Sequence, residues 1–143
     1  MSTFRGLKFA SPRPFNNDGR AVFINDQAPI GVNPSIGNTA WFFLPKGTEV
    51  SYLRFFATDM DSAAGMQAEF GFAPLPGGTV VANNAYFGAA QAFGQTAGGP
   101  DLSFVPITFE EDVAIQVRFT AAATGFTAGT VHCVLGGNSV GVR

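Results

Sequence analysis

Residues 113–120, with the sequence VAIQVRFT, decide the fold class of this chain. Four large apolar side chains alternate there with smaller or more polar ones: Val113, Ile115, Val117 and Phe119. Successive side chains of a β-strand point to opposite faces, so a period of two predicts a strand with one apolar and one wetter face. We expect the apolar face to lie in a hydrophobic core.

Similar strand signals recur along the chain. Residues 66–72 alternate in the same way, and residues 49–58 are rich in Val, Tyr, Leu and Phe. Shorter runs of aromatic and β-branched residues occupy positions 20–24, 39–44, 102–109 and 130–135. Turns rich in Gly and Pro separate these runs, and no amphipathic helix lies between them. The pattern predicts an all-β fold, an antiparallel β-sandwich that is jelly-roll-like.

The first 38 residues carry a different signal. Pro12, Pro14, Pro29 and Pro34 interrupt them, and Pro suits edges and extended segments because it has no N–H to donate. We expect residues 1–38 to form an extended N-terminal arm and loop, and residues 39–143 to form the sandwich of a single globular domain. Residues 83–99, rich in Ala, Gly and Gln, are expected to form a second long loop.

Composition excludes several classes of partner. Only 13% of the residues are charged and the net charge is −2, so the chain lacks the basic stripe that neutralises phosphates, and no nucleic acid partner is expected. Gly and Pro interrupt the uncharged stretch 70–100, which predicts a soluble protein without a membrane span. The first eight residues alternate polar and apolar side chains, so no signal peptide is expected there. Cys133 is the only cysteine, so neither an intrachain disulfide nor a thiolate zinc site is expected.

The sequence GNSVG at positions 137–141 matches the nucleophile elbow of serine hydrolases. An elbow leads into a helix and is followed by an acid and a histidine, whereas only Val142 and Arg143 remain here. A flexible C-terminal turn is the better interpretation. His132 and Cys133 are adjacent in an expected strand, so they point to opposite faces and form no dyad. We expect a core or interface histidine, a buried cysteine and no enzymatic activity.

Two acidic groups have open alternatives. Asp59 and Asp61, with Glu69 on the next strand, either contribute oxygen ligands to a Ca²⁺ site or belong to a turn with a local side-chain cap. Residues 110–112, with the sequence EED, connect two expected strands. They form either a charged hairpin tip or a salt bridge to an arginine of a neighbouring subunit.

Aromatic side chains are the candidate interaction sites. The runs at positions 41–43 and 55–56 place rings on both faces of their strands, so something must cover the second face. The cover is either the rest of the sandwich with an internal loop or a contact between subunits, and stacking on carbohydrate is a third use. The candidate partner or oligomer interface comprises Phe4, Phe9, Phe15, Trp41, Phe43, Phe55, Tyr86, Phe87 and Phe93.

The second half of the chain resembles a known group of proteins. The segments that carry the likeness are VANNAYF at 81–87, FVPITFEEDV at 104–113, VRFTAA at 117–122 and AGTV at 128–131. They resemble small β-rich virion proteins of tailed bacteriophages, and most of all a capsid decoration (cement) protein. The resemblance spans residues 80–135 and rests on strand and hairpin sequences.

This resemblance implies a sandwich that binds the outside of an assembled head and stabilises the shell. It implies the major capsid protein as partner, a homo-oligomer with a trimer favoured, a location on the capsid exterior, and neither cofactor nor catalytic residues. Residues 1–38 are the candidate for pairing with a neighbour's sheet edge. The alternatives are a tail, neck or fibre component of the virion, and a carbohydrate-binding module that uses residues 83–95.

Overall fold

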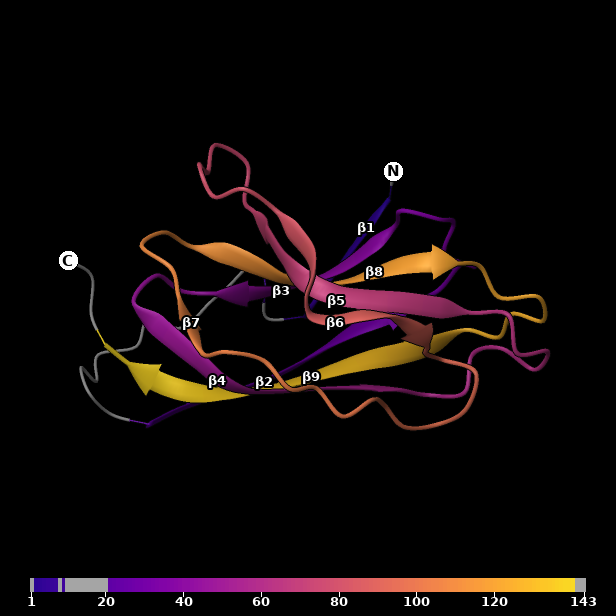
Figure 1. The fold of residues 1–143 in the computed structure, drawn as a ribbon. Coiled ribbons are helices and arrows are strands. Elements are labelled where there is room, and N and C mark those ends of the chain that lie inside the picture. The colour runs from indigo at the N-terminus through magenta and orange to yellow at the C-terminus, as the bar shows by residue number, and fades with distance from the viewer. Residues whose placement is uncertain (1, 8, 10–20, 141–143) are drawn as a thin grey trace.

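The computed structural model describes residues 2–7, 9 and 21–140, and this part of the chain contains strands but no helix. Two sheets face each other across a single core (Figure 1). The strands are β1 (Thr3–Arg5), β2 (Ala21–Ile30), β3 (Thr39–Leu44), β4 (Thr48–Ala57), β5 (Gln67–Pro74), β6 (Asn83–Ala92), β7 (Ile107–Thr108), β8 (Val113–Ala121) and β9 (Gly129–Ser139).

The strand order is that of a jelly roll. The five-stranded sheet has the order β1-β3-β8-β5-β6, and the four-stranded sheet has the order β2-β9-β4-β7. Without β1, eight strands divide into two sheets of four, with antiparallel pairing between neighbours. Strand β1 lies parallel to β3 at the sheet edge. The predicted antiparallel sandwich is confirmed.

The aromatic side chains fill the space between the sheets. On β8, all four side chains of the predicted apolar face are fully buried. Phe55 from the opposite sheet stacks on Phe70, with ring centroids 5.3 Å apart, and also contacts Phe42 at 5.9 Å. Burying one such ring contributes roughly 1.5–3 kcal/mol, so these phenylalanines supply much of the driving force for folding. The other face of β8 is drier than predicted, because Ala114 and Gln116 are also buried.

Strand β2 corrects the predicted arm and loop. Residues 25–30, expected in a loop, continue β2 and pair with β9 along their whole length. Since β2 is an edge strand and β9 is the one strand of the described part that pairs with it, Pro29 removes no bond from a second ladder. Residues 21–30 therefore belong to the sandwich. Of the expected arm, residues 3–5 pair with β3 of the five-stranded sheet, and the N–H of Leu7 donates to the carbonyl of Gln27 on β2. Residues 1, 8 and 10–20 lie outside the described part.

Strand β6 corrects the second expected loop. Residues 83–92 pair with β5, with register shifts on both sides of Phe70. The segment has no apolar period because β6 is an edge strand made mainly of small residues, with only Phe87 deeply buried. The turn that joins β5 to β6 projects from the body of the molecule (Figure 1).

Two further boundaries differ from the prediction. Of the expected strand at 102–109 only Ile107–Thr108 pairs with β4, and Pro106, just before this pair, has no N–H to donate to a ladder. Strand β9 continues through Gly136 and Gly137, which were expected in a turn. Gly137 is required there because a Cβ atom would lie 1.7 Å from the carbonyl oxygen of Glu49.

Candidate functional site

The candidate catalytic groups do not converge. The described residues contain no group of three or more His, Cys, Asp or Glu side chains that could hold a metal ion. His132 is half-buried, and the neighbouring Cys133 points into the core as predicted for adjacent strand residues. Burial, with a smaller effect from the negative charge of Asp26, raises the pKa of the Cys133 thiol far above its usual value. This thiol is therefore a packing group and a poor nucleophile.

The elbow-like sequence lies in a strand. Ser139 is the last residue of β9, and its side chain is buried, with 6% exposure. The hydroxyl thus does not stand exposed on a strand-to-helix turn as a hydrolase nucleophile does. The expected turn at 137–139 is a strand instead, and residues 141–143 lie outside the described part.

Asp61 organises the turn between β4 and β5. Its carboxylate accepts hydrogen bonds from the backbone N–H groups of Ala63, Gly65, Met66 and Gly125, at 2.6–3.0 Å. Burial raises the pKa of this carboxylate, but the four N–H donors outweigh burial and hold it well below the usual range. This arrangement is the local side-chain cap, because the N–H donors occupy the oxygens that a Ca²⁺ ion would need.

Glu111 and Asp112 anchor neighbouring turns. The Glu111 carboxylate accepts bonds from the N–H and hydroxyl of Thr79 and from the N–H of Val80, at 2.6–2.9 Å. The pKa of Glu111 is lowered mainly by the bond from the backbone N–H of Thr79, and further by the bonds from the Thr79 hydroxyl and the N–H of Val80. Burial raises the pKa, but by less than these bonds together lower it. Asp112 accepts a bond from the N–H of Lys46 at 2.8 Å. Glu110 is exposed, and its pairing with a neighbouring subunit stays a prediction.

The nine predicted interface residues separate into groups. Phe55, Phe87 and Phe93 have 0%, 2% and 3% exposure, so their rings pack inside the protomer and we leave them out of the interface. Phe4 is half-buried against the core. Tyr86 is half-buried, with its ring against Phe72 and its hydroxyl donating to the carbonyl of Val105. That packing leaves no open sugar platform at Tyr86. Phe15 lies outside the described residues.

The remaining three rings form a cluster on the outer face of the five-stranded sheet. Phe9 lies between Trp41 and Phe43, with centroid distances of 6.1 and 5.9 Å. The indole N–H of Trp41 donates to Gln116, whose amide donates to Asn84 on β6. The N-terminal segment of the same chain therefore covers part of the second face of β3. This contact corresponds to the intrachain alternative for Trp41 and Phe43.

The most exposed aromatic pair of the described residues was not among the predicted interface residues. Phe23 of β2 is 73% exposed and Tyr52 of β4 is 43% exposed, and their ring centroids lie 6.3 Å apart. Both residues pair with Gly136 of β9, which lies between them. Side chains alternate between the two faces of a strand, so Phe23 points to the other face from Val22 and Ile24. The outward direction of the Phe23 ring could therefore have been predicted from the sequence of residues 20–24. The other exposed large apolar residues are Leu7, Val32, Ile36, Val81, Val105 and Val140.

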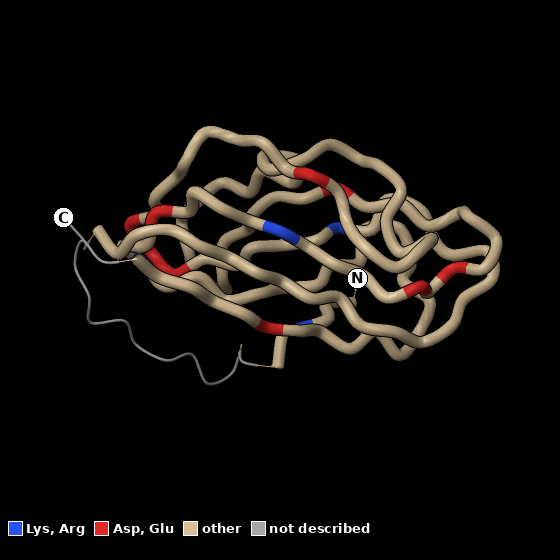
Figure 2. Tube along the Cα trace, turned by 90° about the horizontal axis from the view of Figure 1, so that it is seen from below, with Lys and Arg blue, Asp and Glu red and all other residues tan. Residues whose placement is uncertain are grey.

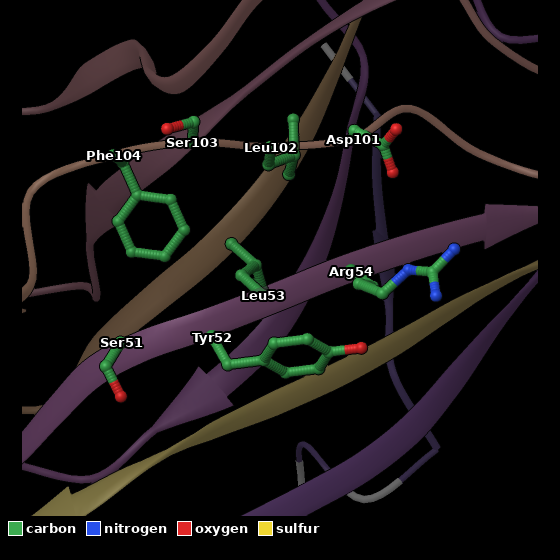
Figure 3. Close-up of a pocket in the computed structure, with 8 residues that line it drawn as sticks. All are labelled: Ser51, Tyr52, Leu53, Arg54, Asp101, Leu102, Ser103 and Phe104. Carbon is green, nitrogen blue, oxygen red and sulfur yellow. The ribbon is translucent and has the colours of Figure 1, made fainter.

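An open groove lies beside Tyr52. Its volume is about 380 Å³, and it separates residues 51–54 of β4 from residues 101–104 (Figure 3). Leu53 points toward Leu102, whereas Tyr52 and Arg54 extend along the outer side. The groove forms where β4 lacks a regular partner, between its pairing with β7 and its bridge to Gly98. No acid–base pair within bonding distance lines it among the described residues.

The fold and these surfaces define a jelly-roll β-sandwich that exposes several large apolar and aromatic side chains. The described part of the chain contains no helix with the length and apolar character needed to cross a membrane.

Comparison with solved structures gives one similar chain, from the capsid of Ralstonia phage GP4. The alignment covers 99% of the present chain and 100% of the phage chain, with a TM-score of 0.76 and 16% sequence identity. At this identity the likeness demonstrates a shared fold. No model of a known protein family matches the sequence. No curated protein sequence matches it either.

Proposed function

We propose that this protein is a structural component of a phage virion that binds the outer surface of the head and stabilises the capsid shell. The observation that carries the proposal is the full-length fold match to a chain of the GP4 capsid. A match over both whole chains favours a shared structural role more than a match to an isolated motif would. The phage-like segments between residues 80 and 135 support the same role independently.

The surface chemistry supports a role in binding rather than in catalysis. Three described residues that could do chemistry have structural roles instead: Cys133 packs in the core, and Asp61 and Glu111 hold turns. Large apolar side chains are exposed instead, with Phe23 at 73%, Val81 at 84% and Val105 at 74%. Phe23 and Tyr52 lie together, with ring centroids 6.3 Å apart, and a contiguous exposed apolar patch favours association with other proteins. We therefore propose a protein without enzymatic activity.

The proposed partner is the major capsid protein, and the proposed location is the capsid exterior. The N-terminal segment can contribute to that contact by adding a strand to a neighbouring sheet edge. In the free protein β1 uses this mode of pairing on β3 of its own chain. We also propose a homo-oligomer on the shell, with a trimer favoured, in which the half-buried rings of Trp41 and Phe43 remain candidate contacts.

A binding assay on isolated heads tests the proposal. Purified protein is mixed with expanded heads that lack it, and the mixture is separated on a density gradient. We expect saturable co-sedimentation with heads and a higher temperature of DNA release from the decorated particles. Binding to isolated tails but not to heads would favour a tail, neck or fibre component, and binding to neither with a hit on a glycan array would favour a carbohydrate-binding module.

A further inference from the structure

The outer face of the four-stranded sheet is an ordered array of side chains. Strand β9 lies in the middle, and its outward residues pair on one side with β2 and on the other with β4. One row across the sheet is Phe23–Gly136–Tyr52, and the next is Asn25–Val134–Arg54. On the other side of the first row, Ala21 and Glu49 flank Asn138. Charged positions are sparse in a view from this side of the molecule (Figure 2).

A β-bulge places two opposite charges symmetrically on this face. Glu49, Tyr52 and Arg54 of β4 pair with Asn138, Gly136 and Val134, which are evenly spaced along β9. The register shifts between Val50 and Tyr52, where Ser51 is the extra residue. Without that shift Glu49 would project from the opposite face to Tyr52 and Arg54. The backbone positions of Glu49 and Arg54 therefore lie at equal distances, about 7 Å, on either side of the Tyr52 row.

Neither charge has an ionic partner among the described residues. The ion pair that is present among them joins Arg118 to Glu69, and both of these residues lie on the five-stranded sheet. The guanidinium of Arg54 lies 4.6 Å from the ring centre of Phe56, so it is held on the surface by a cation–π contact. Glu49 and Arg54 thus lie on either side of exposed aromatic rings, without an ionic partner in the described part of the chain. A partner surface with a positive charge opposite Glu49 and a negative charge opposite Arg54 would pair with both.

We propose that this face binds a second copy of the same chain about a two-fold axis that runs along the Phe23–Gly136–Tyr52 row. Rotation about this axis places Glu49 of each copy opposite Arg54 of the other, so two ion pairs form at once. The Phe23 and Tyr52 rings meet their own counterparts at the centre, where aromatic residues contribute most to binding. Gly136 carries no side chain between the rings, which allows the second sheet to approach to about 10 Å.

This contact does not rest on the proposed function, because it concerns the free protein. A two-fold contact is also compatible with the proposed trimer, since it uses a different sheet from Trp41 and Phe43. On a shell it would join neighbouring oligomers. A protein that does not bind heads could still self-associate through this face, and a protein that does not self-associate could still bind heads.

Charge reversal with rescue tests the contact by sedimentation velocity over a range of protein concentrations. Glu49→Arg and Arg54→Glu each place like charges in opposition, so each should weaken self-association at least about tenfold. The double variant restores opposite charges and should recover the affinity of the natural protein to within about threefold. Phe23→Ala, which removes a ring that is 73% exposed, should also abolish the association without unfolding the chain.

A matched control, Asp59→Arg, makes the same charge change as Glu49→Arg at an exposed position on the turn between β4 and β5. It should leave the association unchanged. A protein that stays monomeric at about 500 µM would overturn the proposal. The proposal would also be overturned if neither single charge reversal changed the affinity of self-association. A double variant that self-associates more weakly than either single variant would overturn it as well.

Discussion

The ring of Phe9 lies against the indole of Trp41, with the two ring centroids 6.1 Å apart. The guanidinium of Arg5 lies 5.0 Å from the Phe9 ring centre and 5.8 Å from that of Trp41. The backbone N–H of Gly6 also donates to the carbonyl of Trp41 at 2.7 Å. These contacts dock the N-terminal segment on its own sheet, so release of the segment would expose the Trp41 surface to a partner.

The docking of this segment can be followed by fluorescence, because Trp41 is the only tryptophan of the chain. We expect Phe9→Ala to shift the emission of Trp41 to the red and to increase its quenching by acrylamide, since the indole gains solvent contact. Phe23→Ala, on the outer face of the other sheet, should leave both unchanged. Identical spectra for Phe9→Ala and the natural protein would contradict the docking.

The two neighbouring phenylalanines of β4 should differ sharply in their contribution to stability. Phe55 is fully buried between Phe42 and Phe70, so Phe55→Ala should lower the free energy of unfolding by about 3–5 kcal/mol. Phe56 is half-exposed on the opposite face, and Phe56→Ala should lower it by about 1 kcal/mol or less. Urea denaturation measures both values, and a larger loss for Phe56→Ala would contradict the assigned strand register.

Asp61 should make stability depend on pH in the acid range. Its pKa is lower in the folded chain than in the unfolded one, so it stabilises the fold above the unfolded pKa of about 4. That stabilisation is lost as the pH falls from there toward the folded pKa. We expect Asp61→Asn to lower Tm by several degrees at neutral pH, with a difference from the natural protein that shrinks below about pH 4.

Asp59→Asn is the matched control for this experiment, because Asp59 is an exposed neighbour on the same turn. It should change Tm little at any pH. A chelator should not change Tm either, since backbone N–H groups occupy the Asp61 carboxylate. A large chelator effect would restore the calcium alternative.

Removal of residues 1–19 should separate folding from attachment. The eight strands of the jelly roll remain in such a variant, so we expect a folded β protein by circular dichroism with a moderately lower Tm. Co-sedimentation with expanded heads should be lost. Unchanged occupancy of the variant on the heads would refute the proposed contribution of the arm to attachment.

Sequence alone predicted the fold wherever one strand face is buried and the other is not. Residues 66–70 are an example, since burial on one side imposes a period of two. In residues 113–119 the large apolar side chains keep this period although Ala114 and Gln116 on the other face are also buried. Prediction from sequence failed for the edge strands, where pairing is governed by backbone bonds: Asn25, Asp26 and Gln27 in β2 look like a loop, and β6 consists of small residues. The glycines of β9 were misassigned because their role depends on Glu49, Phe23 and Tyr52, which are distant in sequence.

The candidate site was predictable only in part, for a similar reason. Counting aromatic residues identified Trp41 and Phe43 but could not separate them from Phe55, whose burial depends on the opposite sheet. The pair of charges at Glu49 and Arg54 depends on the bulge at Ser51, and a strict alternation places these two residues on opposite faces. Sequence patterns of period two do not reveal such a bulge.

The most direct test of the structural role is a cryo-electron microscopy map of the native virion at a resolution that shows strands. We expect density for this jelly roll on the outside of the head, in contact with the major capsid protein and repeated over the shell. A head without such density, or density for this chain confined to the tail, would contradict it.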